Sequence, residues 1–409
     1  MAAKPGGVTR RLFLKGILAA GAAPYLVPAS ALGAEDRPAP SNRLVMGCVG
    51  LGGQGTGDMR GFLGFSEVQV VTVCDVREAS RNGAKSIVDA KYGNADCKAV
   101  NDFRDVVTRP DIDIILCATP DHWHAIVSVT AMKNGKDVYC EKPETLTVRE
   151  GRQVVEVARR YGRVFSGGSQ RVWGDYNWFH KMVRGGAIGQ VKEVWVNCGG
   201  PSNICALPEE PIPEGLDWDM WLGPAPYEPF NRGRLNFRPW RDYSGGGMTD
   251  WGAHRFGGAL FSCNLQNTGP VEVYPPGGEY KQLTFKFANG IVMHHGGGWD
   301  ENMSFKGTEG EIPFRDGRDS KRTVPPGIVI QNYRGKGGIF GDFLHCVRTR
   351  ERPFRDIEVG HRTVTVCHLG NITYWLNRPI KWDPEKEEIV GDPEAARWLD
   401  RPKRAPWGI

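Results

Sequence analysis

Three features are missing from this chain of 409 residues, and each absence excludes a class of protein. The apolar stretch from Gly16 to about Val27 is too short and too rich in glycine and alanine for a stable membrane-spanning helix, so stable membrane insertion is not expected. No stripe of lysine and arginine is interleaved with aromatic residues, and the net charge is only +5, so a nucleic-acid partner is not expected. No Cys-x-x-Cys pair is present, although the chain has 10 cysteines.

The positions of the cysteines argue against a disulfide framework. Four of them lie in or at the end of apolar, strand-like runs, where cysteine acts as a small buried hydrophobe: Cys48, Cys74, Cys117 and Cys140. Cys198 and Cys205 could approach each other across a loop, which leaves one disulfide open. We expect mostly free, buried thiols.

The amino terminus has the pattern of an export leader. Residues 9–15 are TRRLFLK, a mildly apolar stretch follows, and residues 29–31 are small enough for a signal peptidase. This pattern resembles the twin-arginine translocation (Tat) signal. Residues 1–34 are therefore predicted to be a signal peptide that takes the folded protein, through the Tat machinery, to the periplasm or otherwise out of the cell. A basic disordered tail is the alternative interpretation.

Residues 42–168 alternate apolar strands with helical patterns. Strands are predicted at residues 44–49, 68–74, 112–118, 137–140 and 164–166, and helices near residues 54–63, 78–91, 124–133 and 148–161. Nearly continuous Val, Ile and Cys strands separated by helices indicate a parallel sheet that is covered on both faces. This half is therefore predicted to be an α/β Rossmann domain.

The first predicted strand leads into a glycine-rich turn, GLGGQG, over residues 50–55. Gly50, Gly52 and Gly55 stand where a dinucleotide-binding turn needs a tight bend, close approach of a pyrophosphate, and close packing of helix on strand. Asp75 follows Gly55 by 20 residues, at the end of the second strand, where an acid would bind the ribose hydroxyls of adenosine. A carboxylate there repels a 2′-phosphate, so NAD is favoured, and nearby Arg77 leaves NADP open.

Three later motifs extend this pattern: ATPDHWH at residues 118–124, YCEKP at 139–143 and GMTDWGAH at 247–254. In this order they resemble the Gfo/Idh/MocA oxidoreductase family, which contains inositol dehydrogenases, glucose–fructose oxidoreductase and other sugar-processing enzymes. The resemblance covers nearly all of the chain after the leader. It implies an α+β C-terminal domain, residues 169–409, with an open, mostly antiparallel sheet. One face of that sheet would cover the active site, and the other often joins subunits, here into a homodimer or homotetramer.

The residues of the second half support such a domain independently. Strand-like stretches separated by Gly/Pro turns lie at residues 191–197, 271–274, 283–287, 291–295 and 303–305. Residues 339–350 and 359–376 have helical patterns. In the family, a C-terminal helix of this kind packs back near the first domain.

Lys142, Asp250 and His254 are the predicted catalytic residues. The resemblance makes Lys142 the group that transfers the proton of the reacting hydroxyl, and an ion pair with Glu141 is the structural alternative. Asp250 and His254 are four residues apart, and a helix over residues 252–260 would place both on one face, where they can hold one sugar ring or share a proton. A helix-capping role for Asp250 is also open. No third ligand is evident near this pair, so no metal site is predicted.

The predicted binding residues follow the same motifs. The cofactor-binding set is Gly50, Gly52, Gly53, Gln54, Gly55, Asp75, Thr119, Pro120, Trp123, His124, Glu141, Lys142 and Gln170. The substrate-binding set is Arg171, Tyr176, Trp240, Asp250 and His254. Aromatic faces with interspersed polar groups suit a sugar, whose C–H faces stack while its hydroxyls form hydrogen bonds. His294 and His295 face opposite sides of a predicted strand, and their roles stay open.

The leading hypothesis is an exported NAD-dependent oxidoreductase that oxidises or reduces a ring hydroxyl of a sugar, polyol or glycoside. Because nicotinamide cannot readily be resupplied outside the cytoplasm, NAD is expected to stay tightly bound and to be recycled by a second sugar or carbonyl acceptor. One alternative is an NAD-dependent glycoside hydrolase or lyase that works through a transient keto-sugar. A second alternative is a non-catalytic sugar-binding protein on the same scaffold.

Overall fold

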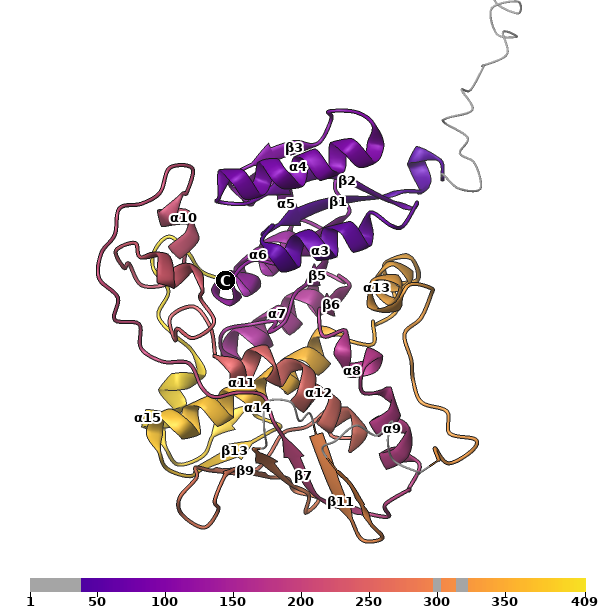
Figure 1. The fold of residues 1–409 in the computed structure, drawn as a ribbon, viewed down its shortest axis with the longest axis vertical. Helices are drawn as coiled ribbons and strands as arrows, with labels where there is room; N and C mark the ends of the chain where they lie inside the picture. Colours follow the sequence, from indigo (N-terminus) through magenta and orange to yellow (C-terminus); the bar gives the residue numbers. More distant parts are fainter. Residues whose placement is uncertain (1–37, 297–302, 314–322) are drawn as a thin grey trace, which may run out of the picture. The chain divides into compact units, whose positions relative to one another are not determined.

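The computed structural model describes residues 38–296, 303–313 and 323–409. The chain divides into two units, residues 1–43 and residues 44–409. In the first unit a short 3₁₀ helix, Pro40–Asn42, is described, and the predicted leader, residues 1–34, lies outside the described residues. The second unit contains both the Rossmann half and the second half, whose elements are labelled in Figure 1.

The Rossmann half contains a six-stranded sheet with the order β3-β2-β1-β4-β5-β6, and all its pairings are parallel. The strands are β1 (Leu44–Val49), β2 (Val68–Cys74), β3 (Lys98–Val100), β4 (Ile114–Cys117), β5 (Asp137–Cys140) and β6 (Phe165–Gly167). The predicted Rossmann fold is confirmed. The edge strand β3 was not predicted, because three residues are too few to show an alternating pattern.

Helices cover both faces of this sheet (Figure 1). The helices α5 (Arg104–Val107), α6 (Asp121–Lys133) and α7 (Val148–Arg160) share a buried core with one face, and α3 (Gly53–Phe62) and α4 (Glu78–Tyr92) share a core with the other. A helix from far along the chain, α13 (Gly338–Thr349), joins the second core. Alternate residues of β4 point into opposite layers, Ile115 into the first core and Leu116 into the second, which explains the continuous apolar run.

The second half contains an eight-stranded sheet with the order β12-β11-β7-β10-β9-β8-β13-β14. The strands are β7 (Val191–Val196), β8 (Glu272–Tyr274), β9 (Leu283–Lys286), β10 (Val292–His295), β11 (Met303–Gly307), β12 (Glu311–Ile312), β13 (Ile380–Asp383) and β14 (Glu388–Ile389). Only the β7–β10 pair is parallel among the pairings of these strands, so the expected mostly antiparallel sheet is confirmed.

One face of the second sheet packs against two buried helices, α12 (Gly252–Ser262) and α14 (Ile357–Leu376). Val194, Phe285 and Met293 are fully buried between these layers. The remaining helices are short: α8 (Arg171–Gly174), α9 (Asn177–Arg184), α10 (Trp218–Leu222), η2 (Arg232–Leu235), α11 (Gly247–Asp250), α15 (Pro393–Ala396) and η3 (Arg397–Leu399). Among the described residues no helix is long and apolar enough to cross a bilayer.

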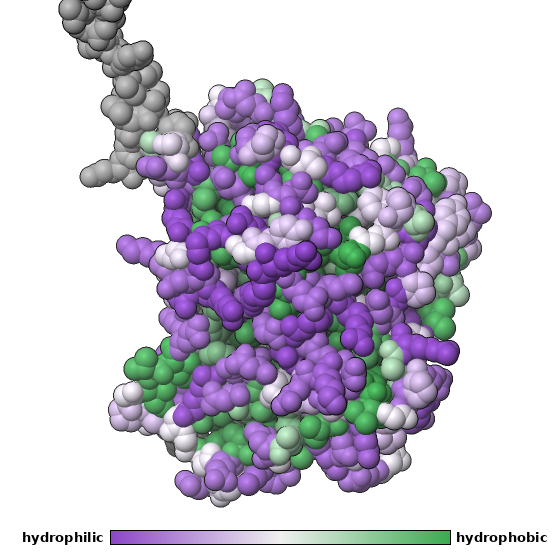
Figure 2. Space-filling view, turned by 180° about the vertical axis from the view of Figure 1, so that it is seen from behind, coloured by the Kyte–Doolittle hydropathy of each residue, from purple (hydrophilic) through white to green (hydrophobic). Residues whose placement is uncertain are grey.

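All ten cysteines are free thiols, and nine of them are buried. Cys198 and Cys205 form no disulfide. Cys48, Cys74, Cys117 and Cys140 are fully or almost fully buried in the strands of the parallel sheet, where their thiols fill space as small apolar groups. The expected free, buried thiols are confirmed. Figure 2 shows one face of the molecule as mostly hydrophilic, with apolar residues in separate small groups.

Candidate active site

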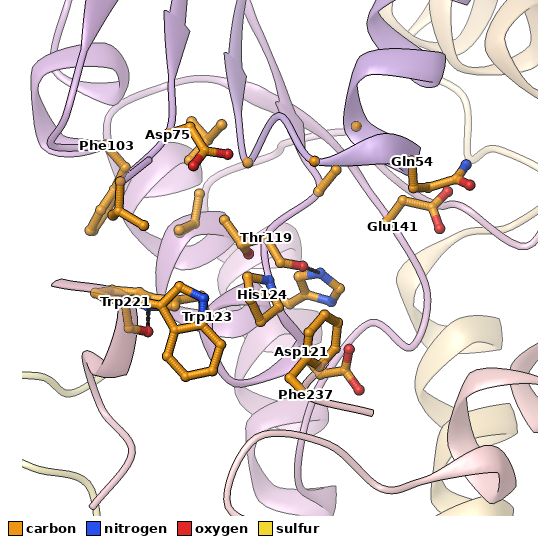
Figure 3. Close-up of a pocket in the computed structure, with 18 of the residues that line it drawn as sticks. Gln54, Asp75, Phe103, Thr119, Asp121, Trp123, His124, Glu141, Trp221 and Phe237 are labelled. Atoms are coloured by element: carbon orange, nitrogen blue, oxygen red, sulfur yellow. Dashed lines mark hydrogen bonds between the residues drawn. The ribbon is translucent and has the colours of Figure 1, made fainter. Parts of the chain in front are cut away.

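A pocket opens at the carboxyl ends of β1, β2, β4 and β5, the edge of a doubly wound sheet where ligands bind (Figure 3). The register pairs Val49 of β1 with both Cys74 of β2 and Cys117 of β4, so the turns that follow these strands meet at one edge. Twelve of the thirteen predicted cofactor-binding residues line this pocket: Gly50, Gly52, Gly53, Gln54, Gly55, Asp75, Thr119, Pro120, Trp123, His124, Glu141 and Lys142. The structure brings together residues that the sequence spreads over almost a hundred positions.

The glycine turn is crowded on one side and open on the other. Gly50 has a φ of +83°, and a Cβ there would lie 2.5 Å from the backbone nitrogen of Thr119. A Cβ on Gly55 would lie 2.0 Å from the carbonyl oxygen of Gly50. At Gly53 a Cβ would meet no described atom within 4 Å, because this position faces the pocket. The turn therefore packs tightly on β4 and leaves a bare backbone and a helix start toward a ligand, which suits a pyrophosphate.

Asp75 supports this turn. Its Oδ2 accepts a hydrogen bond of 2.7 Å from the backbone N–H of Leu51, and its Oδ1 accepts one of 2.8 Å from that of Arg77. The Arg77 side chain lies at ion-pair distance, with its Nε 3.8 Å from Oδ1. The carboxylate thus joins the end of β2 to the glycine turn and lines the pocket as well. The binding of a ribose by Asp75 stays a prediction.

Aromatic side chains close the pocket, and of Phe103, Trp123, Trp221 and Phe237 only Trp123 was predicted from the sequence to bind the cofactor. Trp221 and Phe237 line the pocket from the segment between β7 and α11 (Figure 3). Trp221 stacks on Trp218 at 4.7 Å between ring centres, and the Trp123 indole N–H donates to the carbonyl oxygens of Met220 and Trp221. Because this segment lies about a hundred residues from α6, no local pattern announces the contact.

The two histidines at the start of α6 are held by backbone carbonyls. His124 has Nδ1 2.7 Å from the carbonyl oxygen of Pro143 and Nε2 2.8 Å from that of Thr119. His122 has Nε2 2.9 Å from the carbonyl oxygen of Trp221, and burial lowers its pKa to about 4. His124 therefore links the turn after β4 to the one after β5 at the pocket wall. No cluster of three or more possible metal ligands occurs among the described residues.

Lys142 pairs with an acid from the second half of the chain. Its Nζ lies 2.5 Å from Oδ1 of Asp250, and both side chains are largely buried. Glu141 contacts Lys142 differently, because its Oε2 accepts from the Lys142 backbone N–H at 3.3 Å. The ion pair between Lys142 and the Glu141 side chain, left open by the sequence, is therefore wrong. Burial raises the pKa of Glu141 well above its usual value. The shift favours the neutral carboxyl group, which is a poor partner for a cation.

Asp250 is shared between two cations. The Nε of Arg238 lies 3.1 Å from the same Oδ1 that Lys142 contacts. Burial favours a raised pKa for Asp250, but the charges and hydrogen bonds of Lys142 and Arg238 outweigh burial and lower its pKa. Asp250 is the last residue of α11, and Trp251 is the N-cap of α12. The proposed capping role of Asp250 is therefore wrong, since a helix ends at this residue and the next one begins beyond it.

His254 lies in the first turn of α12 and is almost fully buried. Its Nδ1 is buried and has no hydrogen-bond partner among the described residues. Burial, together with the charges of Lys142 and nearby arginines, holds the pKa of His254 well below its usual value. The imidazole is thus neutral at pH 7. Asp250 forms ion pairs with Lys142 and Arg238. No direct contact joins Asp250 to His254 among the described residues, so the structure does not show the proton that these two side chains could share.

Asp121 is a pocket residue that sequence reasoning passed over. It is buried at the start of α6, and its Oδ2 accepts a hydrogen bond of 2.6 Å from the Ser244 hydroxyl. Burial raises the pKa of Asp121 to about 7, against the opposing effects of Ser244 and Arg238. The motif at residues 118–124 contains this residue, but its burial depends on the chain segment around Ser244, which local sequence does not reveal.

The other predicted residues lie outside this pocket. The backbone carbonyl oxygen of Gln170 accepts a hydrogen bond of 2.8 Å from the Tyr333 hydroxyl, and Arg171 pairs with Asp175. Tyr176 is buried in the core of the second half, and the Trp240 indole donates to the Gly233 carbonyl at 3.0 Å. In β10, His294 lies 2.9 Å from the Thr284 hydroxyl and His295 lies 2.8 Å from that of Tyr374, so both have partners away from the pocket.

Two family models cover most of the chain. Residues 44–169 match the model described as "Oxidoreductase family, NAD-binding Rossmann fold", and residues 182–409 match "Oxidoreductase family, C-terminal alpha/beta domain". The chain belongs to the Gfo/Idh/MocA oxidoreductase family. The dinucleotide-binding fold and the second domain are therefore those of this oxidoreductase family.

Individual members share only part of their sequence with this chain. A glycosyl hydrolase family 109 protein of Shewanella baltica (strain OS155) is 34% identical over 118 residues, which are 28% of this chain and 26% of that protein. Inositol 2-dehydrogenase of Salmonella paratyphi B is 31% identical over 176 residues, 42% of this chain and half of that enzyme. The chain thus spans between a quarter and a half of the length of these curated relatives.

A solved structure shares the fold over a longer stretch. The aldose-aldose oxidoreductase from Caulobacter crescentus, complexed with glycerol, superimposes with a TM-score of 0.57 at 19% identity. The match covers 83% of this chain and 99% of that one. At this identity the likeness establishes the two-domain fold.

The pocket of this family member fits a nicotinamide dinucleotide. Gly50 and Gly55 have no room for a Cβ, so they keep the glycine turn in contact with the sheet. The bare backbone at Gly53 faces the pocket. Trp123, Trp221 and Phe103 provide flat apolar surface. Glu141 and Lys142, which follow β5, belong to the same lining. These residues would hold the dinucleotide between the glycine turn and Lys142.

Proposed function

We propose that this chain is an NAD-dependent oxidoreductase that acts on a ring hydroxyl of a sugar, polyol or glycoside. The observation that carries the proposal is the position of Lys142. Its Nζ lies at the dinucleotide pocket and contacts Asp250, a residue of the second domain. A primary amine paired with a carboxylate, beside a nicotinamide site, is suited to move the proton of a carbinol.

Nicotinamide, when bound, supplies the hydride acceptor or donor. The side chains of the chain itself handle the proton and the orientation of the hydroxyl. Lys142 exchanges the hydroxyl proton at its Nζ. Asp250 holds this amine in place, and its negative charge offsets the positive charges of Lys142 and Arg238. His254 is neutral, so its free Nδ1 is able to accept a hydrogen bond from, or donate one to, a substrate hydroxyl.

The substrate class follows from the relatives and from the site. An inositol 2-dehydrogenase and an aldose-aldose oxidoreductase are among the similar proteins, and their names specify cyclic polyols and aldoses. Lys142, Arg238, Asp250 and His254 offer this chain several donors and acceptors for ring hydroxyls. We infer a carbohydrate or cyclic polyol.

We also propose export and tight retention of NAD. The TRRLFLK leader supports passage through the Tat pathway to the periplasm or beyond. A protein exported in this way needs its dinucleotide bound before it leaves, and a second sugar or carbonyl compound then regenerates it. Denaturation of the purified mature protein should release close to one dinucleotide per chain. An empty supernatant would contradict retention.

Turnover is tested by mixing the dinucleotide-loaded protein with a panel of sugars, polyols and glycosides, followed at the absorbance of reduced nicotinamide. A subset of these compounds should produce the reduced form, and Lys142→Ala should abolish the signal while keeping the bound dinucleotide. Unchanged reduction by Lys142→Ala would refute the role assigned to this residue. A silent panel would leave two alternatives: redox-neutral glycoside hydrolysis, which an aryl glycoside tests, and non-catalytic sugar binding, which equilibrium binding of the same sugars would measure.

Glycoside hydrolysis through a transient keto-sugar is a second candidate, favoured by the likeness to glycosyl hydrolase family 109 proteins. In such a reaction the oxidised ring carbon acidifies the neighbouring C–H, the aglycone leaves by elimination, water adds, and the hydride returns to the sugar. The net reaction is hydrolysis without net redox. Incubation with a simple aryl glycoside separates the two functions: release of the aglycone at constant NAD means hydrolysis, and accumulation of a keto-glycoside means dehydrogenation.

We propose self-association through the outer face of the second sheet. Val194 and Val196 of β7 are buried against the helices, so Trp195 between them faces the other side. There its ring lies 5.2 Å from that of His294. A half-buried tryptophan and histidine on this outer face favour a homodimer or homotetramer. Sedimentation of the purified protein as a monomer at micromolar concentration would argue against it.

A further inference from the structure

A second cavity, of about 380 Å³, lies between the start of α7, the loop after α10 and the C-terminal segment. None of its lining residues belongs to the dinucleotide pocket. Arg401 and Lys403 contribute from the C-terminal segment, Glu150 from the first turn of α7, and Arg241 from the segment before α11. Nothing in the proposed reaction uses these side chains.

Arg241 and Arg401 stand at this cavity without an acidic partner. Arg401 donates from Nη1 to the carbonyl oxygen of Arg241, and the Arg241 guanidinium lies over the ring of Trp375, 4.4 Å from its centre. The Nε atoms of both arginines are buried and have no hydrogen-bond partner among the described residues. No carboxylate of the described chain lies within 4.0 Å of either guanidinium. Two half-buried guanidinium groups, each with an Nε–H that no described group accepts, favour an anion from outside the chain.

Burial shifts the pKa of both arginines in the same direction. It lowers the pKa of Arg401 to about 10, in spite of the opposing charges of Glu150 and Asp242, and Arg241 adds to the lowering. Burial also lowers the pKa of Arg241. Both shifts have the direction expected for guanidinium groups that lack an anion in a partly dry site. A bound anion would reverse them.

The charged side chains at the cavity indicate which ligand charge the site would accept. The lining contains three cations, Arg241, Arg401 and Lys403, and two carboxylates, Glu150 and Asp242. Lys403 is paired with two carboxylates, because its Nζ lies 3.3 Å from Oε1 of Glu150 and 3.3 Å from Oδ1 of Asp400, which does not itself line the cavity. Of the charged lining groups that remain, the two arginines face only Asp242, so the arginine pair keeps one positive charge in excess. A singly charged carboxylate balances it, whereas a phosphate dianion would overcompensate and face Asp242.

The remaining walls suit a sugar ring. Trp398, Pro224 and Pro226 offer flat apolar surface, and Ile204, which is 73% exposed, stands at the rim. Thr147 offers a hydroxyl group. Carbohydrate C–H faces stack on such apolar surfaces, and their hydroxyls bond to carboxylates and hydroxyl groups.

We propose that this cavity is a binding site for a sugar acid, a uronate-type monocarboxylate, with its carboxylate on Arg241 and Arg401 and its ring against Trp398 and the 224–226 loop. The site is separate from the dinucleotide pocket and independent of the function proposed for that pocket. It lets the protein hold an acidic saccharide without oxidising it.

Calorimetric titration of the full-length, dinucleotide-loaded protein with D-glucuronate tests the proposal, with D-glucose, acetate and inorganic phosphate as comparison probes. Glucuronate should bind more tightly than each of the three. Arg401→Gln and Arg241→Gln should each weaken its binding by roughly tenfold or more, because a charged hydrogen-bond partner is lost. Arg397→Gln, an exposed arginine of the same segment that does not line the cavity, is the matched control and should bind normally.

Two further variants keep the test decisive. Ile204→Glu places a carboxylate at the exposed rim, where it cannot disturb the core, and should weaken glucuronate binding if the arginine variants fold poorly. Lys142→Ala should leave binding unchanged, and a loss there would locate glucuronate in the active site and overturn the proposal. Equal binding of acetate or phosphate would reduce the cavity to a general anion site. Absence of glucuronate binding, or binding unaffected by the cavity variants, would also overturn the proposal.

Discussion

Replacement of Gly55 by alanine tests whether the glycine turn holds the dinucleotide. The new Cβ would lie 2.0 Å from the carbonyl oxygen of Gly50 and 3.0 Å from the Cβ of Ala118. The first contact is roughly 1.5 Å shorter than the distance at which non-bonded atoms attract. Both partners of this contact belong to the backbone of one tight turn, so a side-chain rotation cannot relieve it. The start of α3 must move away from β1.

The displacement should cost stability and, more strongly, affinity. Overpacking of this kind destabilises a protein by about 1–3 kcal/mol. A shifted turn also withdraws the backbone N–H groups at the start of α3 from a pyrophosphate, and two lost hydrogen bonds to a charged group correspond to about 3–6 kcal/mol. Affinity for the dinucleotide should therefore fall by roughly 10²–10⁴-fold. Purified Gly55→Ala protein should carry almost no dinucleotide.

Gly57→Ala is the matched control, because it makes the same chemical change two residues further along α3. A Cβ at Gly57 would meet no described atom within 4 Å. Alanine in this exposed helical position should raise the free energy of unfolding by about 0.5–1 kcal/mol and leave the dinucleotide in place. The assay compares the dinucleotide released on denaturation with the urea unfolding curve of each variant. The reasoning fails if Gly55→Ala retains as much dinucleotide as Gly57→Ala.

Three further predictions concern the acids of the site and the leader. Asp250→Asn removes the carboxylate that holds Lys142, so kcat in the nicotinamide assay should fall by roughly 10²-fold or more. The control is Asp111→Asn, a remote change that should match the wild type, and full activity of Asp250→Asn would contradict the role of Asp250. Burial raises the pKa of Asp121 from 3.8 to about 7, so its contribution to stability is complete below pH 4 and is lost as the pH rises through 7. Asp121→Asn should therefore flatten the pH dependence of urea unfolding between pH 4 and 8 by about 2–4 kcal/mol, and an unchanged slope would show that this carboxyl ionises freely. Replacement of both leader arginines, Arg10→Lys and Arg11→Lys, should leave the protein in the cytoplasmic fraction. Export of this double variant at the wild-type level would refute the Tat assignment.

Local pattern was sufficient for the parallel sheet. The predicted strands at residues 44–49, 68–74 and 137–140 have the bounds of β1, β2 and β5, because each is a buried apolar run closed by residues that turn. The glycine turn and the motifs after β4 and β5 also lie where they were expected, since a dinucleotide site depends on short segments at the ends of adjacent strands. The weaker predictions were at element ends. Asp250 was placed at a helix start because the break between α11 and α12 leaves no trace in composition.

By itself the sequence determined a Rossmann half, a second mixed domain and the dinucleotide turn, because strand burial and turn chemistry are encoded within a few neighbouring residues. The candidate catalytic set came from the motifs that resemble those of the Gfo/Idh/MocA family. Only the tertiary structure decided the partners. It joined Lys142 to Asp250 across 108 positions and gave Asp250 a second cation in Arg238. It also brought Trp221 and Phe237 to the pocket, and it placed Arg241 and Arg401 at a second cavity with no described carboxylate within 4.0 Å of either guanidinium. Such contacts depend on how distant segments pack together and exclude water, and no single segment carries that information.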